Sequence, residues 1–191
     1  DDRTSRGLGD VYKRQAPNIL LIANIGAVQL NYGITHQECN ELMNSIDADG
    51  IYLHLNSLQE VIQPEGDTNF QDLDVKIKEL INTLKKPILI KEVGSGFSDY
   101  DFKVLSDIGI KYIDISGSGG TSWSYVESKR SDNSNLGELF KDWGVPTPIA
   151  LKLSRPYKDK FTFISSGGVR NGIDMVLSLI HISEPTRRTI I

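Results

Sequence analysis

Cysteine and long apolar runs are both scarce in this sequence. Cys39 is the only cysteine among 191 residues, so neither an intrachain disulfide nor a multi-cysteine metal site can form. No apolar stretch reaches the roughly 20 residues that a membrane-spanning helix needs, and residues 1–15 lack the apolar centre of a signal peptide. We therefore expect a cytoplasmic protein with no membrane partner.

Basic charge is also in the minority. The chain has 21 Lys and Arg against 25 Asp and Glu, a formal net charge of −4. This balance argues against broad non-specific contact with nucleic acid. A local basic pocket for a phosphate ester is still compatible with it. The sequence thus favours a small anionic ligand and no nucleic-acid partner.

The two ends of the chain lack the pattern of the rest. Residues 1–15 are polar and without periodicity, and residues 179–191, which include His181, break off the pattern that precedes them. Both resemble translated adapter sequence, with natural tails as the alternative. We predict a non-native or disordered extension over 1–15, a folded region over 16–178 and a non-native or disordered tail over 179–191. His181 is assigned no role.

Short apolar runs and amphipathic helical patterns alternate between the two ends. Thr35 with Glu38 predicts a capping box at the start of one helix. Another helix is expected to begin near Ser98 and to stop at Gly109. This alternation of strand, loop and helix predicts a parallel sheet of the α/β class. The expected strands are 18–24, 51–55, 87–92, 111–116 and 161–165.

Two architectures contain such a sheet, an open doubly wound one and a closed eight-stranded barrel. Polar motifs follow nearly every expected strand, whereas an open sheet would concentrate its chemistry at one switch point. The distribution of polar motifs therefore favours the barrel. A complete barrel needs about 250 residues, and the chain has only five strand-helix units. We expect an incomplete TIM (β/α)8 barrel.

The segment 50–66 has the makeup of a functional site. Its apolar run alternates with period two and ends in an imidazole (His54), two amides (Asn56 and Gln59) and a carboxylate (Glu60). A hard cation such as Mg²⁺ takes oxygen ligands and often binds through one carboxylate plus substrate phosphates, which suits Glu60. A lone histidine is more often structural, and that alternative is open for His54.

Two glycine-rich turns follow later strands, one over 116–121 and one over 165–172. Glycine lets a backbone approach a phosphate closely, and the free N–H groups of a following helix start suit an anion. The alternative is a tight turn or a flexible connection that merely needs glycine. Lys91 ends a strand where it would face an apolar interior, so a partner is expected, with a salt bridge to Glu92 or another carboxylate as the simplest one. Asn24 is either a capping amide or a ligand contact.

Several of these motifs together resemble one known family, the type 2 isopentenyl-diphosphate isomerases. The matching residues are His54-Leu-Asn56, Gln59-Glu60 and Gln63-Pro-Glu-Gly66, within a resemblance that covers 17 to about 175. The family uses reduced FMN and a divalent metal to move a double bond. The resemblance implies that residues 16–178 are a partial FMN-binding (β/α) barrel with about strands 3 to 7 present.

The resemblance also implies roles for individual residues. Gln59 and His54 would be catalytic, and together with Asn56 they would bind substrate. Glu60 would hold the metal, Mg²⁺. Because the Gln59 amide does not titrate usefully, the reduced flavin is implied to exchange the proton. The residues implied to bind FMN are Asn24, Lys91, Ser116, Thr121, Gly167, Gly168 and Val169.

The sequence thus predicts an isomerase that interconverts isopentenyl and dimethylallyl diphosphate in isoprenoid biosynthesis. NAD(P)H is the implied reductant, and a homo-oligomer, tetramer or octamer, is implied for the full-length form. Trp123, Glu127 and Arg130 also match the family but are assigned no catalytic role. Two alternatives are an FMN-dependent barrel oxidoreductase of a hydroxy acid or similar metabolite, and a non-catalytic fragment of the isomerase.

Overall fold

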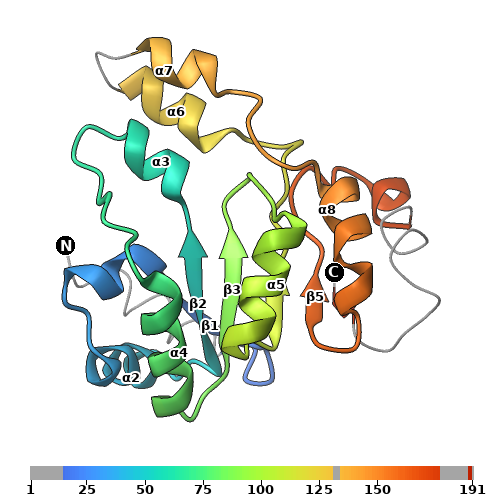
Figure 1. The fold of residues 1–191 in the computed structure, drawn as a ribbon. Coiled ribbons are helices and arrows are strands. Elements are labelled where there is room, and N and C mark those ends of the chain that lie inside the picture. The colour runs from blue at the N-terminus through green and yellow to red at the C-terminus, as the bar shows by residue number, and fades with distance from the viewer. Residues whose placement is uncertain (1–14, 131–133, 177–188, 191) are drawn as a thin grey trace.

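The computed structural model describes residues 15–130, 134–176 and 189–190 (Figure 1). The predicted non-native ends, 1–15 and 179–191, lie outside these residues apart from Gln15, Thr189 and Ile190. Within the described part of the chain, no helix combines the length and the apolar character needed to cross a bilayer.

A single parallel sheet forms the centre of the fold. Its strand order is β1-β2-β3-β4-β5-β6, and every neighbouring pair is parallel. Because the strands are parallel, their carboxyl ends all lie at one edge of the sheet. The strands are β1 (Ile22–Gly26), β2 (Gly50–Leu55), β3 (Ile88–Glu92), β4 (Tyr112–Asp114), β5 (Thr162–Ile164) and β6 (Thr189–Ile190).

The prediction of an incomplete TIM (β/α)8 barrel is wrong, whereas the α/β class is confirmed. The sheet is open, since among the described residues β1 pairs only with β2 and β6 only with β5. Alternation of strands and helices predicts parallel neighbours, but closure depends on strand number and stagger, which local periodicity does not encode. The sequential strand order has no reversal that would concentrate the polar residues at one switch point.

The first strand forms later in the chain than expected. The apolar run at 18–24 predicted a strand, but β1 begins at Ile22. Ile19 and Leu20 are 52% and 66% exposed, so the start of the run is not part of the core. Apolar character marked the segment correctly but not the residue at which pairing begins.

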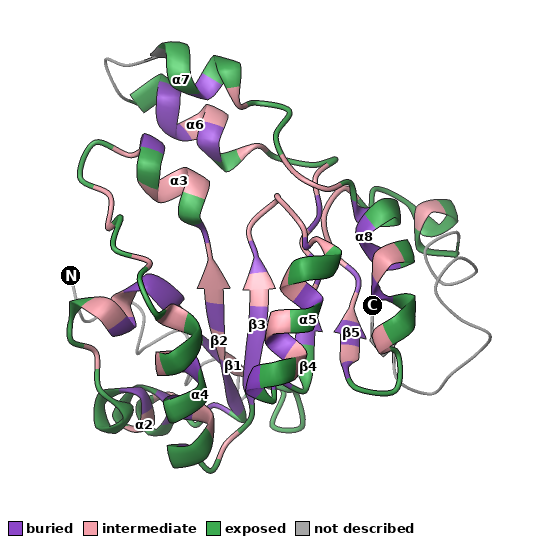
Figure 2. Cartoon of the chain, viewed as in Figure 1, coloured by how far each residue is buried: buried purple, intermediate pink, exposed green. Residues whose placement is uncertain are grey.

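Four helices cover one face of the sheet (Figure 1). They are α2 (His36–Ser45), α4 (Leu73–Thr83), α5 (Asp99–Ile108) and α8 (Thr147–Ser154). The capping box of Thr35 and Glu38 is confirmed, as are the Ser98 cap of α5 and its stop at Gly109. Each helix turns an apolar stripe toward the sheet, and these stripes form the core with Ile51, Leu53, Ile90 and Ile113, which are fully buried (Figure 2).

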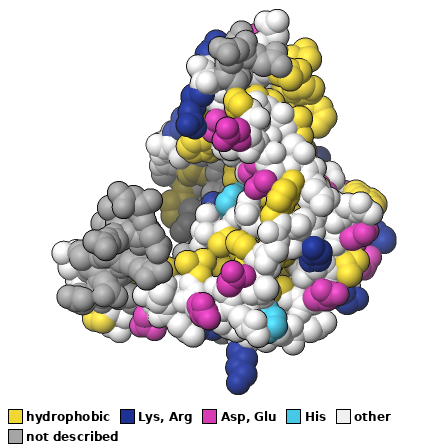
Figure 3. Space-filling model, turned by 90° about the vertical axis from the view of Figure 1, so that its left-hand side faces the viewer, with side chains coloured by type: hydrophobic (Ala, Val, Ile, Leu, Met, Phe, Trp, Pro, Cys, Tyr) yellow, Lys and Arg dark blue, Asp and Glu magenta, His cyan; other side chains and the backbone are white. Residues whose placement is uncertain are grey.

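The remaining helical segments lie beyond or beside the sheet. In Figure 1, α3, α6 and α7 lie past the carboxyl ends of β2 and β3. Hydrophobic side chains of this region are exposed, among them Leu139 (73%) and Trp143 (59%), and yellow side chains gather in the upper part of Figure 3. These segments are η1 (Ala27–Tyr32), α3 (Ser57–Ile62), α6 (Trp123–Arg130), α7 (Ser134–Leu139) and η2 (Arg155–Tyr157).

Candidate active site

A row of polar residues runs across the sheet near its carboxyl edge. His54 of β2 is in register with Lys91 of β3, and Lys91 is in register with Asp114 of β4. Residues in register on neighbouring strands point to the same face of a sheet. Their neighbours Leu53, Ile90 and Ile113 pack in the core with the helices, so the polar row points to the opposite face.

His54 is held by an amide on the edge strand. Its Nδ1 lies 3.2 Å from Oδ1 of Asn24 in β1. Burial lowers the pKa of His54, the charge of Lys91 lowers it further, and Glu60 opposes the shift. The imidazole is therefore mainly neutral at pH 7, with one nitrogen as donor and the other as acceptor.

The carboxylate of Glu60 stabilises the start of the segment that follows β2. It accepts a hydrogen bond from Nδ2 of Asn56 at 2.7 Å and another from the backbone N–H of Asp67 at 2.8 Å. Asn56 is 5% exposed, and its Oδ1 has no hydrogen-bond partner within the described residues. Asn56 and Glu60 thus belong to one polar unit, as their shared motif suggested.

Gln59 is oriented by a buried carboxylate of α6. Its Nε2 donates to Oε1 of Glu127 at 3.1 Å. Glu127 is 5% exposed and forms an ion pair with Arg130 at 3.2 Å. The sequence assigned Glu127 and Arg130 no catalytic role, and the structure shows that Glu127 orients Gln59 and pairs with Arg130.

Lys91 has an aromatic neighbour. Its Nζ lies 5.6 Å from the ring centroid of Tyr52, within the range of a cation–π interaction. The simple alternative of a salt bridge to Glu92 is wrong, because adjacent residues of a strand point to opposite faces and Glu92 instead accepts from the N–H groups of Val93 and Ser95. Among the described residues, Lys91 forms no ion pair.

The two glycine-rich turns are packed against each other. A Cβ added to Gly167 would lie 2.2 Å from the carbonyl oxygen of Gly117, and one added to Gly168 would lie 2.8 Å from the carbonyl carbon of Gly119. Arg170 joins the turns as well, since its Nη2 donates to the Gly119 carbonyl at 2.9 Å. The close approach requires glycine, as the sequence suggested, and it brings the backbones of both turns together.

A pocket of about 230 Å³ lies between the ends of β3, β4 and β5. Its lining includes five of the seven residues predicted to bind FMN, namely Lys91, Ser116, Thr121, Gly167 and Gly168. Of the other two, Asn24 contacts His54 and Val169 is 37% exposed. The structure therefore gathers residues that lie up to 77 positions apart (91 to 168) around one cavity.

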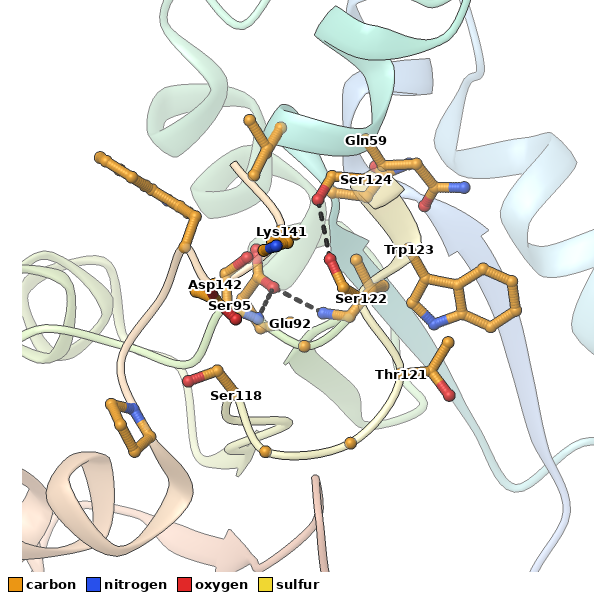
Figure 4. Close-up of a pocket in the computed structure, with 18 residues that line it drawn as sticks. Gln59, Glu92, Ser95, Ser118, Thr121, Ser122, Trp123, Ser124, Lys141 and Asp142 are labelled. Atoms are coloured by element: carbon orange, nitrogen blue, oxygen red, sulfur yellow. Dashed lines mark hydrogen bonds between the residues drawn. The ribbon is translucent and has the colours of Figure 1, made fainter. Parts of the chain in front are cut away.

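A second pocket, of about 400 Å³, adjoins the first (Figure 4). Asn56 and Gln59 line it, and Figure 4 shows Gln59 and Ser124 in the upper part of the view and Glu92 near its centre. Burial raises the pKa of the Glu92 carboxyl to about 7, and the hydrogen bonds from the N–H groups of Val93 and Ser95 oppose this shift only in part. Asn56 and Gln59, two of the three residues predicted to bind substrate, thus lie in a cavity next to that of the predicted cofactor residues, and the two cavities share Glu92 and Thr121. His54 and Glu60 line neither of these two cavities.

Several proteins of known name are similar to this chain. No protein-family model matches the chain. Curated proteins do match, and one from Hydrogenovibrio crunogenus is 54% identical over 168 residues, 86% of this chain and 49% of that protein. One from Rickettsia bellii is 50% identical over 165 residues, 85% of this chain and 48% of that protein. Both are named isopentenyl-diphosphate delta-isomerase.

A third relative, from Rickettsia canadensis, carries the same name and is 51% identical over 162 residues, 83% of this chain and 47% of that protein. The chain spans about half the length of the curated isopentenyl-diphosphate delta-isomerases it matches. The printed names give isomerase activity to these relatives and leave their cofactor and metal open.

The glycine turns and Glu60 differ in how well they suit a flavin phosphate and a cation. The turns offer backbone N–H groups in a cradle that any Cβ would fill, with Lys91 in the same pocket, which suits a phosphate ester. No group of three or more His, Cys, Asp or Glu side chains that could hold a metal exists within the described part of the chain. A cation at Glu60 would therefore need oxygens from substrate and water.

Sequence reasoning missed three residues that organise this region, Tyr52, Asp114 and Ser166. The Asp114 carboxylate accepts from the hydroxyls of Ser116, Ser166 and Tyr52. A signal was present, since Tyr112-Ile-Asp114 alternates as the His54 strand does and places Asp114 on the polar side. The partners of Asp114 could not be found from the sequence, because they lie on other strands.

Proposed function

We propose that this chain is part of a type 2 isopentenyl-diphosphate isomerase, which interconverts isopentenyl and dimethylallyl diphosphate with reduced FMN and Mg²⁺. The names of relatives at 50–54% identity support the isomerase class. The pocket that joins Lys91 to the two glycine turns carries the cofactor part of the proposal. A diphosphate substrate alone would not need two mutually packed turns in addition to the polar unit of Asn56, Gln59 and Glu60.

Backbone N–H groups of Gly167, Gly168 and Val169 would bind the FMN phosphate, while Lys91 would balance negative charge on the flavin ring. When bound, reduced FMN supplies the group that adds and removes the substrate proton. The cation–π contact with Tyr52 limits where the Lys91 ammonium can lie. NAD(P)H is proposed as the reductant that maintains the active form of the flavin.

Mg²⁺ would be held by Glu60 and by oxygens of the substrate diphosphate. The hydrogen bond from Asn56 fixes one carboxylate oxygen, and the N–H of Asp67 fixes the other. Each oxygen retains a lone pair for a cation, because an ionised carboxylate has about four acceptor sites. Glu60 is thus positioned before any cation arrives, which lowers the entropy cost of binding.

His54 and Gln59 would contact the diphosphate and the reacting end of the substrate. A neutral His54, with Nδ1 bonded to Asn24 Oδ1, donates from Nδ1 and presents Nε2 as an acceptor. Gln59 donates to Glu127, which leaves its amide oxygen to orient a donor in the pocket. Homo-oligomerisation of the complete protein is proposed alongside this activity.

The activity is tested in a chimera, because the chain covers about half of its relatives. The matched stretch of the Hydrogenovibrio crunogenus protein is replaced by that of this chain, and conversion of isopentenyl diphosphate is followed with reduced FMN and Mg²⁺. We expect conversion without net oxidation of substrate. Glu60→Gln should raise the Mg²⁺ concentration needed for half-maximal rate by about tenfold or more, since loss of a charged ligand costs over about 1.4 kcal/mol.

Lys91→Ala is compared with Lys103→Ala, a substitution of an exposed lysine on α5. The first should weaken FMN binding by about tenfold, because a charge-assisted contact contributes about 1.5–3 kcal/mol, and the second should leave it unchanged. Metal dependence that survives Glu60→Gln would contradict the metal assignment. Net oxidation of a hydroxy acid by the chimera would favour the oxidoreductase alternative instead.

A further inference from the structure

The Asp114 carboxylate decides the direction of the hydrogen bonds around it. Its Oδ1 accepts from the Ser116 hydroxyl at 3.2 Å and from the Ser166 hydroxyl, and its Oδ2 accepts from the Tyr52 hydroxyl at 3.4 Å. The two serine hydroxyl oxygens are themselves 2.9 Å apart. An ionised carboxylate can only accept, so each of these hydroxyls must direct its proton inward.

The hydroxyl protons of Ser116 and Ser166 are both used within this cluster. Each hydroxyl has one proton, and Ser166 directs its proton to Asp114. Ser116 directs its proton either to Asp114 or to the Ser166 oxygen. In both arrangements no proton is left for a ligand, whereas the Ser116 oxygen keeps at least one free lone pair. Ser116 also lines the pocket of about 230 Å³ that contains Lys91.

The backbone of Ser116 is held in a strained conformation by the hydrogen bonds of this residue. Its φ is +39°, in the left-handed region that residues other than glycine rarely adopt. The hydroxyl is tied to Asp114 and Ser166, and the carbonyl of Ser116 accepts from the N–H of Gly96 at 3.1 Å. Glycine would fit this backbone with less strain, so the serine contributes its side chain at a conformational cost.

We propose that Asp114 makes Ser116 a hydrogen-bond acceptor toward the ligand, so that Ser116 receives a hydroxyl or N–H group and not a phosphate oxygen. The inference rests on the proposed function, and for FMN the donor is a ribityl hydroxyl. The phosphate then lies with the N–H groups of the turn that contains Gly167 and Gly168, away from the Asp114 charge. Asp114 is a positioning residue, because it acts through Ser116.

Two ligands separate the two kinds of contact. Riboflavin carries the ribityl hydroxyls without the phosphate, and inorganic phosphate carries only acceptor-rich oxygens. Binding of riboflavin and FMN to the full chain is measured by flavin fluorescence, and binding of phosphate by its competition with FMN. The variants are Ser116→Gly, which removes the hydroxyl and suits the positive φ, and Asp114→Ala, which frees the serine protons. Ser45→Ala, at an exposed serine of α2, is the control.

We expect Ser116→Gly and Asp114→Ala to weaken riboflavin binding by about three- to tenfold, the effect of one hydrogen bond. Neither variant should weaken phosphate binding, and Ser45→Ala should change neither ligand. A merely structural role of Asp114 would weaken both ligands in parallel. If Asp114→Ala does not fold, as judged by circular dichroism, Ser116→Gly decides alone.

The outcomes distinguish the inference from the function on which it rests. Wild-type protein that binds no FMN would overturn the flavin proposal and the inference with it. Wild-type protein that binds FMN and riboflavin, with phosphate affinity lowered by Ser116→Gly, would show that the hydroxyl donates to phosphate and would overturn the inference alone. Unchanged riboflavin affinity in both variants would overturn it as well.

Discussion

Replacement of Gly167 by alanine tests whether the site depends on the close packing of its two glycine turns. Gly167 has φ +93°, and a Cβ there would lie 2.2 Å from the Gly117 carbonyl oxygen and 2.6 Å from the Gly117 nitrogen. A left-handed conformation costs an L-residue about 1–2 kcal/mol. Displacement of a packed backbone costs about 1–3 kcal/mol more. We therefore expect Gly167→Ala to lower the free energy of unfolding by about 2–5 kcal/mol.

Two other glycines separate the contributions. Gly33 has φ +101° with no atom within 4 Å of an added Cβ, so Gly33→Ala should cost only the conformational part, about 1–2 kcal/mol. Gly172 has neither a positive φ nor a close neighbour, so Gly172→Ala should be neutral or slightly stabilising. The three variants thus form a series with none, one and both of the two effects.

Urea unfolding followed by far-ultraviolet circular dichroism gives the three free energies, and flavin fluorescence gives FMN affinity for the same proteins. Gly167→Ala should also weaken FMN binding, because the turns must separate to accept the methyl group. Equal destabilisation by Gly167→Ala and Gly33→Ala would show that the turns do not constrain each other. The account of the phosphate cradle would then fail, whatever the activity of the protein.

Two further predictions concern pH and helix capping. Burial raises the pKa of Glu92 from 4.5 to about 7, so the carboxyl stabilises the fold most below pH 4.5, and this contribution is lost as the pH rises through 7. Unfolding at a series of pH values should show the wild type losing about 3 kcal/mol relative to Glu92→Gln over this window; parallel curves would contradict the assignment. Thr35→Ala should lower the free energy of unfolding by about 1 kcal/mol, because the capping box of α2 loses its acceptor for the Glu38 N–H. An unchanged urea midpoint would argue that the box contributes nothing.

Local signals in the sequence predicted local structure well. The capping box at Thr35, the helix start near Ser98 and the glycine stop at Gly109 depend on residues only a few positions apart, so spacing alone reveals them. The wrong barrel prediction and the late start of β1 have a different origin. Closure of a sheet and the exact start of pairing depend on partners elsewhere in the chain, which apolar periodicity does not specify.

The same distinction applies to the candidate site. His54, Asn56, Gln59 and Glu60 lie close together in sequence, so their motif could be recognised from spacing alone, and in the structure a hydrogen bond joins Asn56 to Glu60. Asp114 remained unnoticed because its partner Tyr52 is 62 positions away and Ser166 is 52 positions away. A single polar residue in a short strand shows its importance only when the register of the sheet brings its partners together.

Register also explains why the polar row is stable although its own contacts are weak. A slip of β3 by one residue against β2 would turn Lys91 toward the helices and Ile90 toward the polar face. Ile90, Leu53 and Ile113 are 0% exposed, and burial of such a side chain contributes about 1.5–3 kcal/mol. The apolar face therefore fixes the register from which His54, Lys91 and Asp114 take their positions.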